Sequence, residues 1–163
     1  MDYSFRRVND NDQEVVISIY NYFVENSFAA YPEKKVAYDF FEKLKEMAKG
    51  YPFYVIETED KEVIGFGLLQ RYHSMDVFKR VAKVMYFILP LHTRKGLGKK
   101  LLNILVEEAK EMGIDTLLAN ISSMNEISLS FHDKNGFKQC GRFRRIGKKF
   151  RKDFDEIWVQ RSI

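Results

Sequence analysis

The stretch VAKVMYFILPLHTRKGLGKK, residues 81–100, predicts a strand, a basic loop and the start of a helix in direct succession. Residues 81–89 form an apolar run typical of a buried strand, and Pro90 ends it. The helix that follows runs through Met112 and has one apolar face, formed by Leu101, Leu102, Leu105, Val106 and Ala109. The first turn of a helix carries unsatisfied N–H groups and a partial positive charge, so this junction favours an anion.

The loop itself combines two glycines with four cations in the order Arg94, Lys95, Gly96, Leu97, Gly98, Lys99 and Lys100. Glycine lets the backbone approach a ligand closely, so a phosphate or pyrophosphate is the predicted ligand. A P-loop is excluded because no hydroxyl residue follows Lys99, and a dinucleotide fingerprint is excluded because Leu101 replaces its third glycine. The alternative is an ordinary loop and helix cap.

Length and composition predict a single globular domain spanning residues 1–163. The chain is 45% hydrophobic, which is enough for an independent core. No apolar run reaches the length of a membrane span, and the N-terminal MDYSFRR lacks a signal-peptide core. Cys140 is the only cysteine, which fits a reducing compartment, and we expect it in the core. A cytoplasmic protein without a membrane partner is therefore expected.

The formal charge of +4 is concentrated near the C-terminus, in a segment that holds Arg142, Arg144, Arg145, Lys148, Lys149, Arg151 and Lys152. Such a cluster is compatible with a nucleic-acid-binding module. A solvated pair of strands explains the same charges more simply, so we expect no nucleic-acid partner.

The rest of the chain alternates between strand and helix patterns. Strands are expected at 3–8, 53–58, 63–69, 116–121, 137–146 and 156–160, and helices at 10–23, 36–47 and 125–134. Asp10 and Gln13 have the spacing of a capping box at the first helix. The order βααβββαβαββ predicts an α/β fold in which helices cover a mixed sheet.

A second motif comprises Asn125, His132 and the pair Gly136-Phe137. It resembles the N-x6-Y-x3-G-F helix of the GNAT acetyltransferases, with His132 at the tyrosine position. The glycine loop is similar to the R/Q-x-x-G-x-G/A loop of the same family, with Thr93 at the first position. The histidine variant resembles the branch that contains phosphinothricin and amino-acid N-acetyltransferases. The segments IYNYFVENSF, YPFYVIETEDKEVIGFG and GRFRRIGKKFRKDFDEIWVQ extend the likeness over nearly the whole chain.

The resemblance implies the GNAT fold and acetyl-CoA as co-substrate, and the chain lacks the Cys and carboxylate clusters that a metal site would need. It assigns the acetyl-pantetheine arm to the backbone of Tyr86, Phe87 and Ile88, and the pyrophosphate to Arg94, Lys95, Gly96, Leu97, Gly98 and Lys99. Asn125 and Ser128 would bind the donor, with Asn125 contacting the arm or ordering a water. His132 would lie near the sulfur and protonate the leaving thiolate, because imidazole titrates near neutrality. A purely structural histidine is the alternative.

Lys83 departs from the branch, which carries a glutamate base at this position. A lysine with a pKa depressed by burial could replace that base. Alternatively, Lys83 binds an acidic substrate while water, Glu33 or Asp76 accepts the proton, which is the interpretation we prefer. Weak or absent activity, or a lysine that only reaches solvent at a sheet edge, are the further alternatives.

The acceptor loop also departs from the branch, whose N-F-R-T-E-P segment reads SFAAYP at residues 27–32. Ala29 and Tyr31 replace an arginine and a glutamate, which predicts a less charged, more aromatic pocket and argues against phosphinothricin. We predict that Phe28, Tyr31 and Tyr72 contact the acceptor.

Several residues near the C-terminus and two further histidines are expected to have no role in catalysis or metal binding. Gly147, Lys149 and Asp155 match the branch and are expected in a structural role or at a dimer seam. Trp158 is expected in the core or an interface. His73 and His92 lack the spacing of a metal site.

Together these patterns predict direct transfer of an acetyl group from acetyl-CoA to the primary amine of a small molecule, an amino acid or an analogue, by a homodimer. Backbone N–H groups would stabilise the oxyanion, and no covalent acyl-enzyme is expected. The alternatives are acetylation of a protein or peptide and a non-catalytic acetyl-CoA-binding protein.

Overall fold

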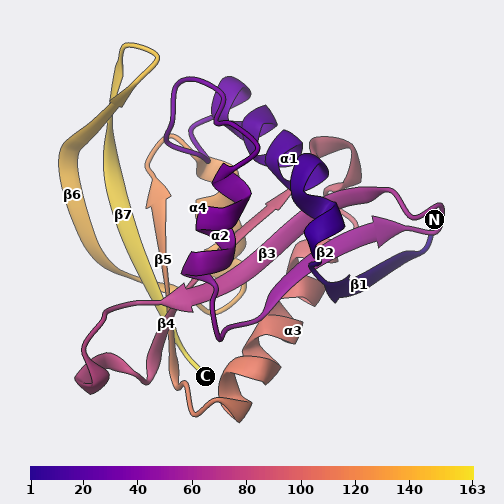
Figure 1. The fold of residues 1–163 in the computed structure, drawn as a ribbon. Helices are drawn as coiled ribbons and strands as arrows, with labels where there is room; N and C mark the ends of the chain where they lie inside the picture. The colour runs from indigo at the N-terminus through magenta and orange to yellow at the C-terminus, as the bar shows by residue number, and fades with distance from the viewer.

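The computed structural model describes residues 1–163 as one seven-stranded sheet with helices on both faces (Figure 1). The strands are β1 (Tyr3–Arg7), β2 (Phe53–Thr58), β3 (Val63–Arg71), β4 (Val81–Ile88), β5 (Thr116–Ser122), β6 (Lys138–Lys149) and β7 (Lys152–Ser162). The helices are α1 (Gln13–Asn26), α2 (Phe40–Met47), α3 (Leu97–Glu111) and α4 (Glu126–Lys134), with 3-10 turns at Asp10–Asp12, Asp76–Phe78 and Pro90–His92. The predicted α/β fold and element order are confirmed.

The strand order is β1-β2-β3-β4-β5-β7-β6, and only β4 and β5 run parallel. Their ladder is short, because it joins residues 81–83 to residues 116–118 and then stops. Beyond Lys83, β4 continues to Ile88 paired only with β3, while β5 continues to Ser122 paired only with β7. The two strands therefore separate in the middle of the sheet, and backbone groups that would have joined them face the gap.

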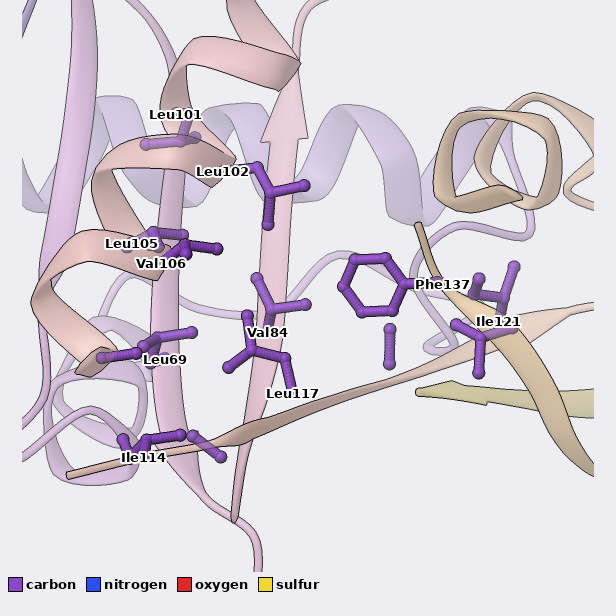
Figure 2. Close-up of a cluster of buried hydrophobic side chains, with 14 of the residues drawn as sticks. Leu69, Val84, Leu101, Leu102, Leu105, Val106, Ile114, Leu117, Ile121 and Phe137 are labelled. Carbon is purple, nitrogen blue, oxygen red and sulfur yellow. The ribbon is translucent and has the colours of Figure 1, made fainter. Parts of the chain in front are cut away.

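Two apolar clusters flank the sheet. Helices α1 and α2 cover one face, where Val16, Phe41 and Phe66 belong to the same cluster. Helix α3 covers the other, where its Leu101, Leu102, Leu105 and Val106 form one apolar cluster with Val84 and Leu117 of the sheet (Figure 2). Because helices cover β3 from both sides, its residues 63–70 are all buried. No helix is long and apolar enough to span a membrane.

The two N-terminal helices begin later than the sequence predicts. Asn9, not Asp10, caps the first turn, because its side chain accepts from the Asn11 amide while Asp12 accepts from the Asn9 amide. Helix α2 begins at Phe40 instead of Val36. The Asn21 side chain binds both the N–H and the C=O of Val36, which holds that residue outside the helix.

The last two strands are longer than predicted and form one hairpin. Its turn contains Phe150 and Arg151, both with positive φ, a conformation that suits a two-residue hairpin. Ion pairs link Arg142 and Arg144 to Asp155, and Arg145 and Lys148 to Asp153. Much of the basic cluster is thus paired along a solvated hairpin.

The prediction that Cys140 lies in the core is wrong, because Cys140 is exposed. It lies on the outermost strand at an irregularity between Gln139 and Gly141, where the register with β7 shifts by one residue. A bulge turns side chains away from the alternation that the sequence pattern assumes.

Candidate active site

A cavity of about 230 Å³ occupies the gap between β4 and β5. Residues 83–87 and 119–122 form two of its walls, and α1, α4 and the loop after α1 supply the others. Its lining gathers side chains from five separate segments, including Tyr31, Lys83, Tyr86, Asn125, Ser128 and His132. A second depression, of about 510 Å³, lies between α1 and residues 35–38, away from these groups.

His132 is the most constrained side chain of this cavity. It is 3% exposed, and its Nδ1 lies 2.7 Å from the carbonyl oxygen of Ser128. A carbonyl only accepts, so Nδ1 carries the hydrogen. Nε2 therefore accepts from the Tyr86 hydroxyl, which lies 2.5 Å away. Burial lowers the pKa of His132, so the imidazole is neutral at neutral pH.

Tyr86, on β4, contacts His132 of α4 through both its ring and its hydroxyl group. Its ring stacks on the imidazole at 5.5 Å between centroids and meets Phe131 edge to face. Burial raises the pKa of Tyr86, so the hydroxyl keeps its proton. The sequence assigned only the backbone of Tyr86 to the site, because the partner of its side chain lies 46 residues away.

Asn125 and Ser128 form the N-terminal cap of α4. The Asn125 Oδ1 accepts from the Ser128 amide at 3.2 Å, so the motif asparagine has a structural task. Its Nδ2 has no hydrogen-bond partner within the chain, and Asn125 lines the cavity, which leaves this group free to donate to a ligand. The Ser128 hydroxyl lies 3.2 Å from Nδ1 of His132.

Lys83 lies inside the sheet and not at an edge, because it pairs with Gln70 of β3 and Leu118 of β5. Its side chain lines the cavity, and its Nζ lies 5.7 Å from the centroid of the Trp158 ring. Burial lowers the pKa of Lys83, and the opposing charge of Glu156 reduces this effect. The arrangement favours a role in the cavity over a lysine that merely reaches solvent.

Glu156 is a site residue that the sequence interpretation missed. Its Oε2 accepts from the Tyr31 hydroxyl at 2.8 Å and from the Asn120 side chain at 3.1 Å, while Oε1 accepts from the Trp158 indole. These donors come from β5, β7 and the loop after α1, and two of them line the cavity. Trp158 is half-buried and belongs to this cluster. Nothing in the local sequence distinguishes Glu156 from other charged residues of the hairpin.

The carboxylates named as alternative bases lie elsewhere. Glu33 accepts from the Phe150 amide at the hairpin turn, and Asp76 pairs with Arg71. Neither lines the cavity. The structure therefore leaves Glu156 as the carboxylate adjacent to Lys83.

The glycine loop leads into α3 as the sequence predicts. Gly96 has φ +78° and is the N-cap, with no side chain closing the first turn. An L-residue is strained in this conformation, so glycine is required here. Gly98 has a packing role, because a Cβ there would lie 3.0 Å from the Phe131 ring. The N–H groups of Leu97, Gly98 and Lys99 remain open to an anion, with the side chains of Arg94 and Lys95 in the same loop.

The remaining predicted residues lie at varied distances from the cavity. Phe87 lines it, whereas Ile88 does not. Phe28 packs against the rings of Phe150 and Phe154, behind the wall formed by Ala29 to Tyr31. Tyr72 is 42% exposed and packs on Phe78, outside the cavity. No group of three His, Cys, Asp or Glu side chains is placed to hold a metal ion.

Lys149 supports the site from behind. It is 1% exposed, and its Nζ donates to the carbonyl oxygens of Val24, Ser27 and Ala30 at 2.6–2.7 Å. The hairpin is thereby tied to the loop that carries Tyr31. Gly147 is required beside Phe154, since a Cβ there would overlap that ring. Both residues thus have structural roles within one chain.

Known acetyltransferases resemble this chain in both sequence and structure. The L-amino acid N-acyltransferase MnaT of Escherichia coli is 31% identical, over 98% of this chain and 94% of that protein. The YncA structure from Salmonella typhimurium, determined with its cofactor acetyl-CoA, has a TM-score of 0.88 at 29% identity, covering 98% of this chain and 93% of that one. A ribosomal-protein-alanine N-acetyltransferase from Brucella melitensis has a TM-score of 0.89 at 27% identity, covering 98% and 99%. The acetyltransferase (GNAT) domain model matches residues 5–158, so the chain belongs to the GNAT acetyltransferase family.

Proposed function

We propose that the protein transfers the acetyl group of acetyl-CoA to the primary amine of a small molecule, an L-amino acid or an analogue. The observation that carries this proposal is the divided sheet, which opens a cavity lined by Lys83 and closed at one side by Glu156 and its donors. The identity to an L-amino acid N-acyltransferase over 98% of the chain supports the acceptor class. The YncA structure with acetyl-CoA supports the donor.

The donor would bind along the β4 wall of the cavity and extend to the start of α3. The open N–H groups at the start of α3, with Arg94, Lys95 and Lys99, would hold the pyrophosphate. The backbone of residues 86–88, which has no β5 partner, would line the pantetheine arm, and Asn125 Nδ2 would donate to it. One of the free β4 N–H groups would stabilise the oxyanion that forms when the amine attacks the thioester.

The acceptor would bind at the side formed by β5, β7 and the loop after α1. An amino acid carries an ammonium and a carboxylate, and this side offers one opposite charge for each. Lys83 would attract the carboxylate, and Glu156 would attract the ammonium before it loses its proton. Tyr31, held by Glu156, would form an aromatic wall.

Acetylation of a peptide N-terminus is the second candidate. The likeness to the ribosomal-protein-alanine N-acetyltransferase favours it. Such an acceptor has its carboxylate in an amide bond, so the Lys83 charge would have no partner at the α position. The two candidates therefore differ in their need for a free α-carboxylate.

The test is release of the CoA thiol at about pH 8, where a larger share of α-amino groups is neutral. L-Amino acids, their α-amides and a peptide beginning with alanine are compared as acceptors. Turnover with amino acids but not with their amides would support the proposal, and Lys83→Met should raise the acceptor KM. Turnover with the peptide alone would favour the second candidate. No turnover, with acetyl-CoA binding retained in calorimetry, would identify a non-catalytic binding protein.

We further propose that residues 1–163 act as one domain of a cytoplasmic homodimer that pairs through the last two strands. The hairpin presents exposed apolar side chains at Phe143, Ile146 and Phe150, which are 54%, 61% and 41% exposed. Light scattering after size exclusion tests the assembly. A dimer that Ile146→Asp converts to monomers supports the interface, whereas a wild-type monomer contradicts it.

A further inference from the structure

We propose that the Tyr86 hydroxyl and the His132 imidazole form a two-way proton relay, which takes the proton from the acceptor nitrogen and returns it to the leaving sulfur. This inference rests on the proposed acetyl transfer. It identifies Tyr86 as a catalytic residue through its side chain. It also supplies a base in a chain whose Lys83 occupies the position of the expected glutamate.

The geometry prepares both residues for this task. Nδ1–H of His132 donates to the Ser128 carbonyl, so the tautomer leaves a lone pair on Nε2. That lone pair receives the hydrogen of the Tyr86 hydroxyl at 2.5 Å. Because Nε2 is occupied by this hydrogen bond, the hydroxyl is the group of the pair that would pass protons to and from a bound molecule. Both side chains line the cavity between β4 and β5.

The Tyr86 hydroxyl could serve both proton transfers because of the structure of the adduct that the amine and the thioester form. When the amine adds to the thioester, the nitrogen and the sulfur become substituents of the same carbon. A hydroxyl beside that carbon lies near both atoms. A proton can thus leave the nitrogen and reach the sulfur through a single group, without a base on one side of the cavity and an acid on the other.

The proton balance closes in two steps. The C–N bond forms, the N–H proton of the adduct moves to the Tyr86 oxygen, and the phenolic proton moves to Nε2 of His132, giving an imidazolium. The C–S bond then breaks with its electron pair on sulfur. The imidazolium returns its Nε2 proton to the Tyr86 oxygen, and the phenolic proton moves to sulfur. An amide and a thiol leave, and both side chains regain their initial states.

The residues around Tyr86 and His132 favour the neutral form of both side chains at rest. They can also stabilise the imidazolium that forms on His132 during the reaction. Burial lowers the pKa of His132 and raises the pKa of Tyr86, so the histidine keeps its lone pair and the tyrosine its proton. The Ser128 carbonyl then stabilises the transient imidazolium through Nδ1. Arg161 on β7 is the charged group that acts on Tyr86, and the other rings packed on His132, Phe131 and Phe137, carry no charge.

Two variants and a control test the relay in the full-length protein. Tyr86→Phe removes only the hydroxyl, and His132→Gln removes the basic nitrogen. Tyr51→Phe is the control, because Tyr51 packs against the same apolar cluster but lies outside the cavity. For each protein, kcat, the acetyl-CoA dissociation constant and the pH profile of kcat are measured with the best acceptor.

The relay predicts that each variant lowers kcat by about 100-fold or more, the usual contribution of a positioned acid–base group. The double variant should be no worse than either single one, because the residues act in series. Acetyl-CoA affinity and the control should stay at wild-type values. In the wild type, kcat should fall where His132 gains a proton, below about pH 6.5, and Tyr86→Phe should abolish that limb.

The relay is overturned if Tyr86→Phe keeps wild-type kcat in an active enzyme, since His132 would then act directly or not at all. It is also overturned if nitrogen NMR finds the His132 hydrogen on Nε2 instead of Nδ1, a result that does not depend on turnover. An inactive wild type would instead refute the proposed function, and the NMR result would still decide the resting geometry that the relay requires.

Discussion

The loop before α3 and the charged cluster around Glu156 are built in different ways, although we propose that both bind substrates. The loop consists of consecutive residues, 94–100, and its conformation follows from Gly96 and the helix that it starts. The cluster joins Tyr31, Lys83, Asn120 and Glu156, which come from four elements or loops. A local site is visible in the sequence, whereas a site assembled by strand pairing appears only when the register is known.

The cluster should therefore depend on tertiary contacts that the loop does not need. Lys149→Met tests this, because it removes the cation from three buried carbonyl groups that hold the loop carrying Tyr31. Each buried carbonyl left without a donor costs about 1–3 kcal/mol and three are left here, so we expect the free energy of unfolding in urea to fall by about 3 kcal/mol. Lys148→Met, on the exposed side of the hairpin, is the control. Equal stability of the two variants would contradict the role given to Lys149.

Glu156→Gln should impair use of the acceptor amine without weakening the binding of acetyl-CoA. The substitution keeps the size of the side chain but removes the charge that faces Lys83. We expect kcat/KM for the amine to fall by about 100-fold, or about 2.7 kcal/mol, because a desolvated charge contact to the acceptor is lost. The acetyl-CoA dissociation constant should not change. Weaker acetyl-CoA binding with an unaltered acceptor KM would reverse the assignment of the two sides.

The lowered pKa of His132 should make the stability of the protein depend on pH. The folded-state pKa of His132 is lowered, so between that value and about 6.5 the unfolded chain binds more protons than the folded one. Stability therefore rises with pH through this window, by at most about 1.4 kcal/mol per pH unit, and is then constant. His132→Gln should flatten this slope in urea titrations. An unchanged slope would mean that His132 is not buried as a neutral ring.

Asp12 should affect stability over a different, more acidic pH range than His132. The two ranges can be compared within the same protein. Its pKa is lowered despite the opposing effect of burial, because Arg6 and the Asn9 amide donate to its carboxylate. Its contribution is present above about pH 4 and is lost as the pH falls further. His132→Gln should leave this acid limb unchanged.

The glycine loop should show the smallest effects, spread over several exposed charges. Lys95→Ala and Lys99→Ala should each weaken acetyl-CoA binding by about two- to five-fold, because exposed cations near a helix N-terminus add modest attraction to the backbone contacts. The difference should shrink at 1 M salt, where screening acts over about 3 Å. A loss that is insensitive to salt would indicate a direct, buried contact that the loop geometry does not suggest.

The sequence predicted what depends on neighbouring residues. The apolar run at 81–89, the helical spacing after Gly98 and the strand patterns of β2 and β3 led to the observed elements, since burial periodicity is a local property. Capping by Asn9 and the late start of α2 were missed, because side-chain contacts from Asp12 and Asn21 decide them.

In the candidate site, too, features set by neighbouring residues were predicted and features set by tertiary contacts were missed. The histidine of the α4 motif was found by its spacing, but its tautomer and its hydrogen bond to Tyr86 require the packing of α4 on β4. Glu156 was missed because its donors lie up to 125 residues away in the sequence. Tyr72 was predicted to contact the acceptor, but in the structure its ring packs against Phe78 of the 3-10 turn at Asp76–Phe78.

A crystal structure of the protein with acetyl-CoA would show whether the gap between β4 and β5 holds the reacting thioester. We expect the pyrophosphate at the N–H groups of residues 97–99 and the thioester sulfur within hydrogen-bond reach of the Tyr86 hydroxyl. Lys83 and Glu156 should lie on the far side of the acetyl group. A thioester outside this cavity, or a sulfur separated from Tyr86 by another side chain, would refute the proposed site.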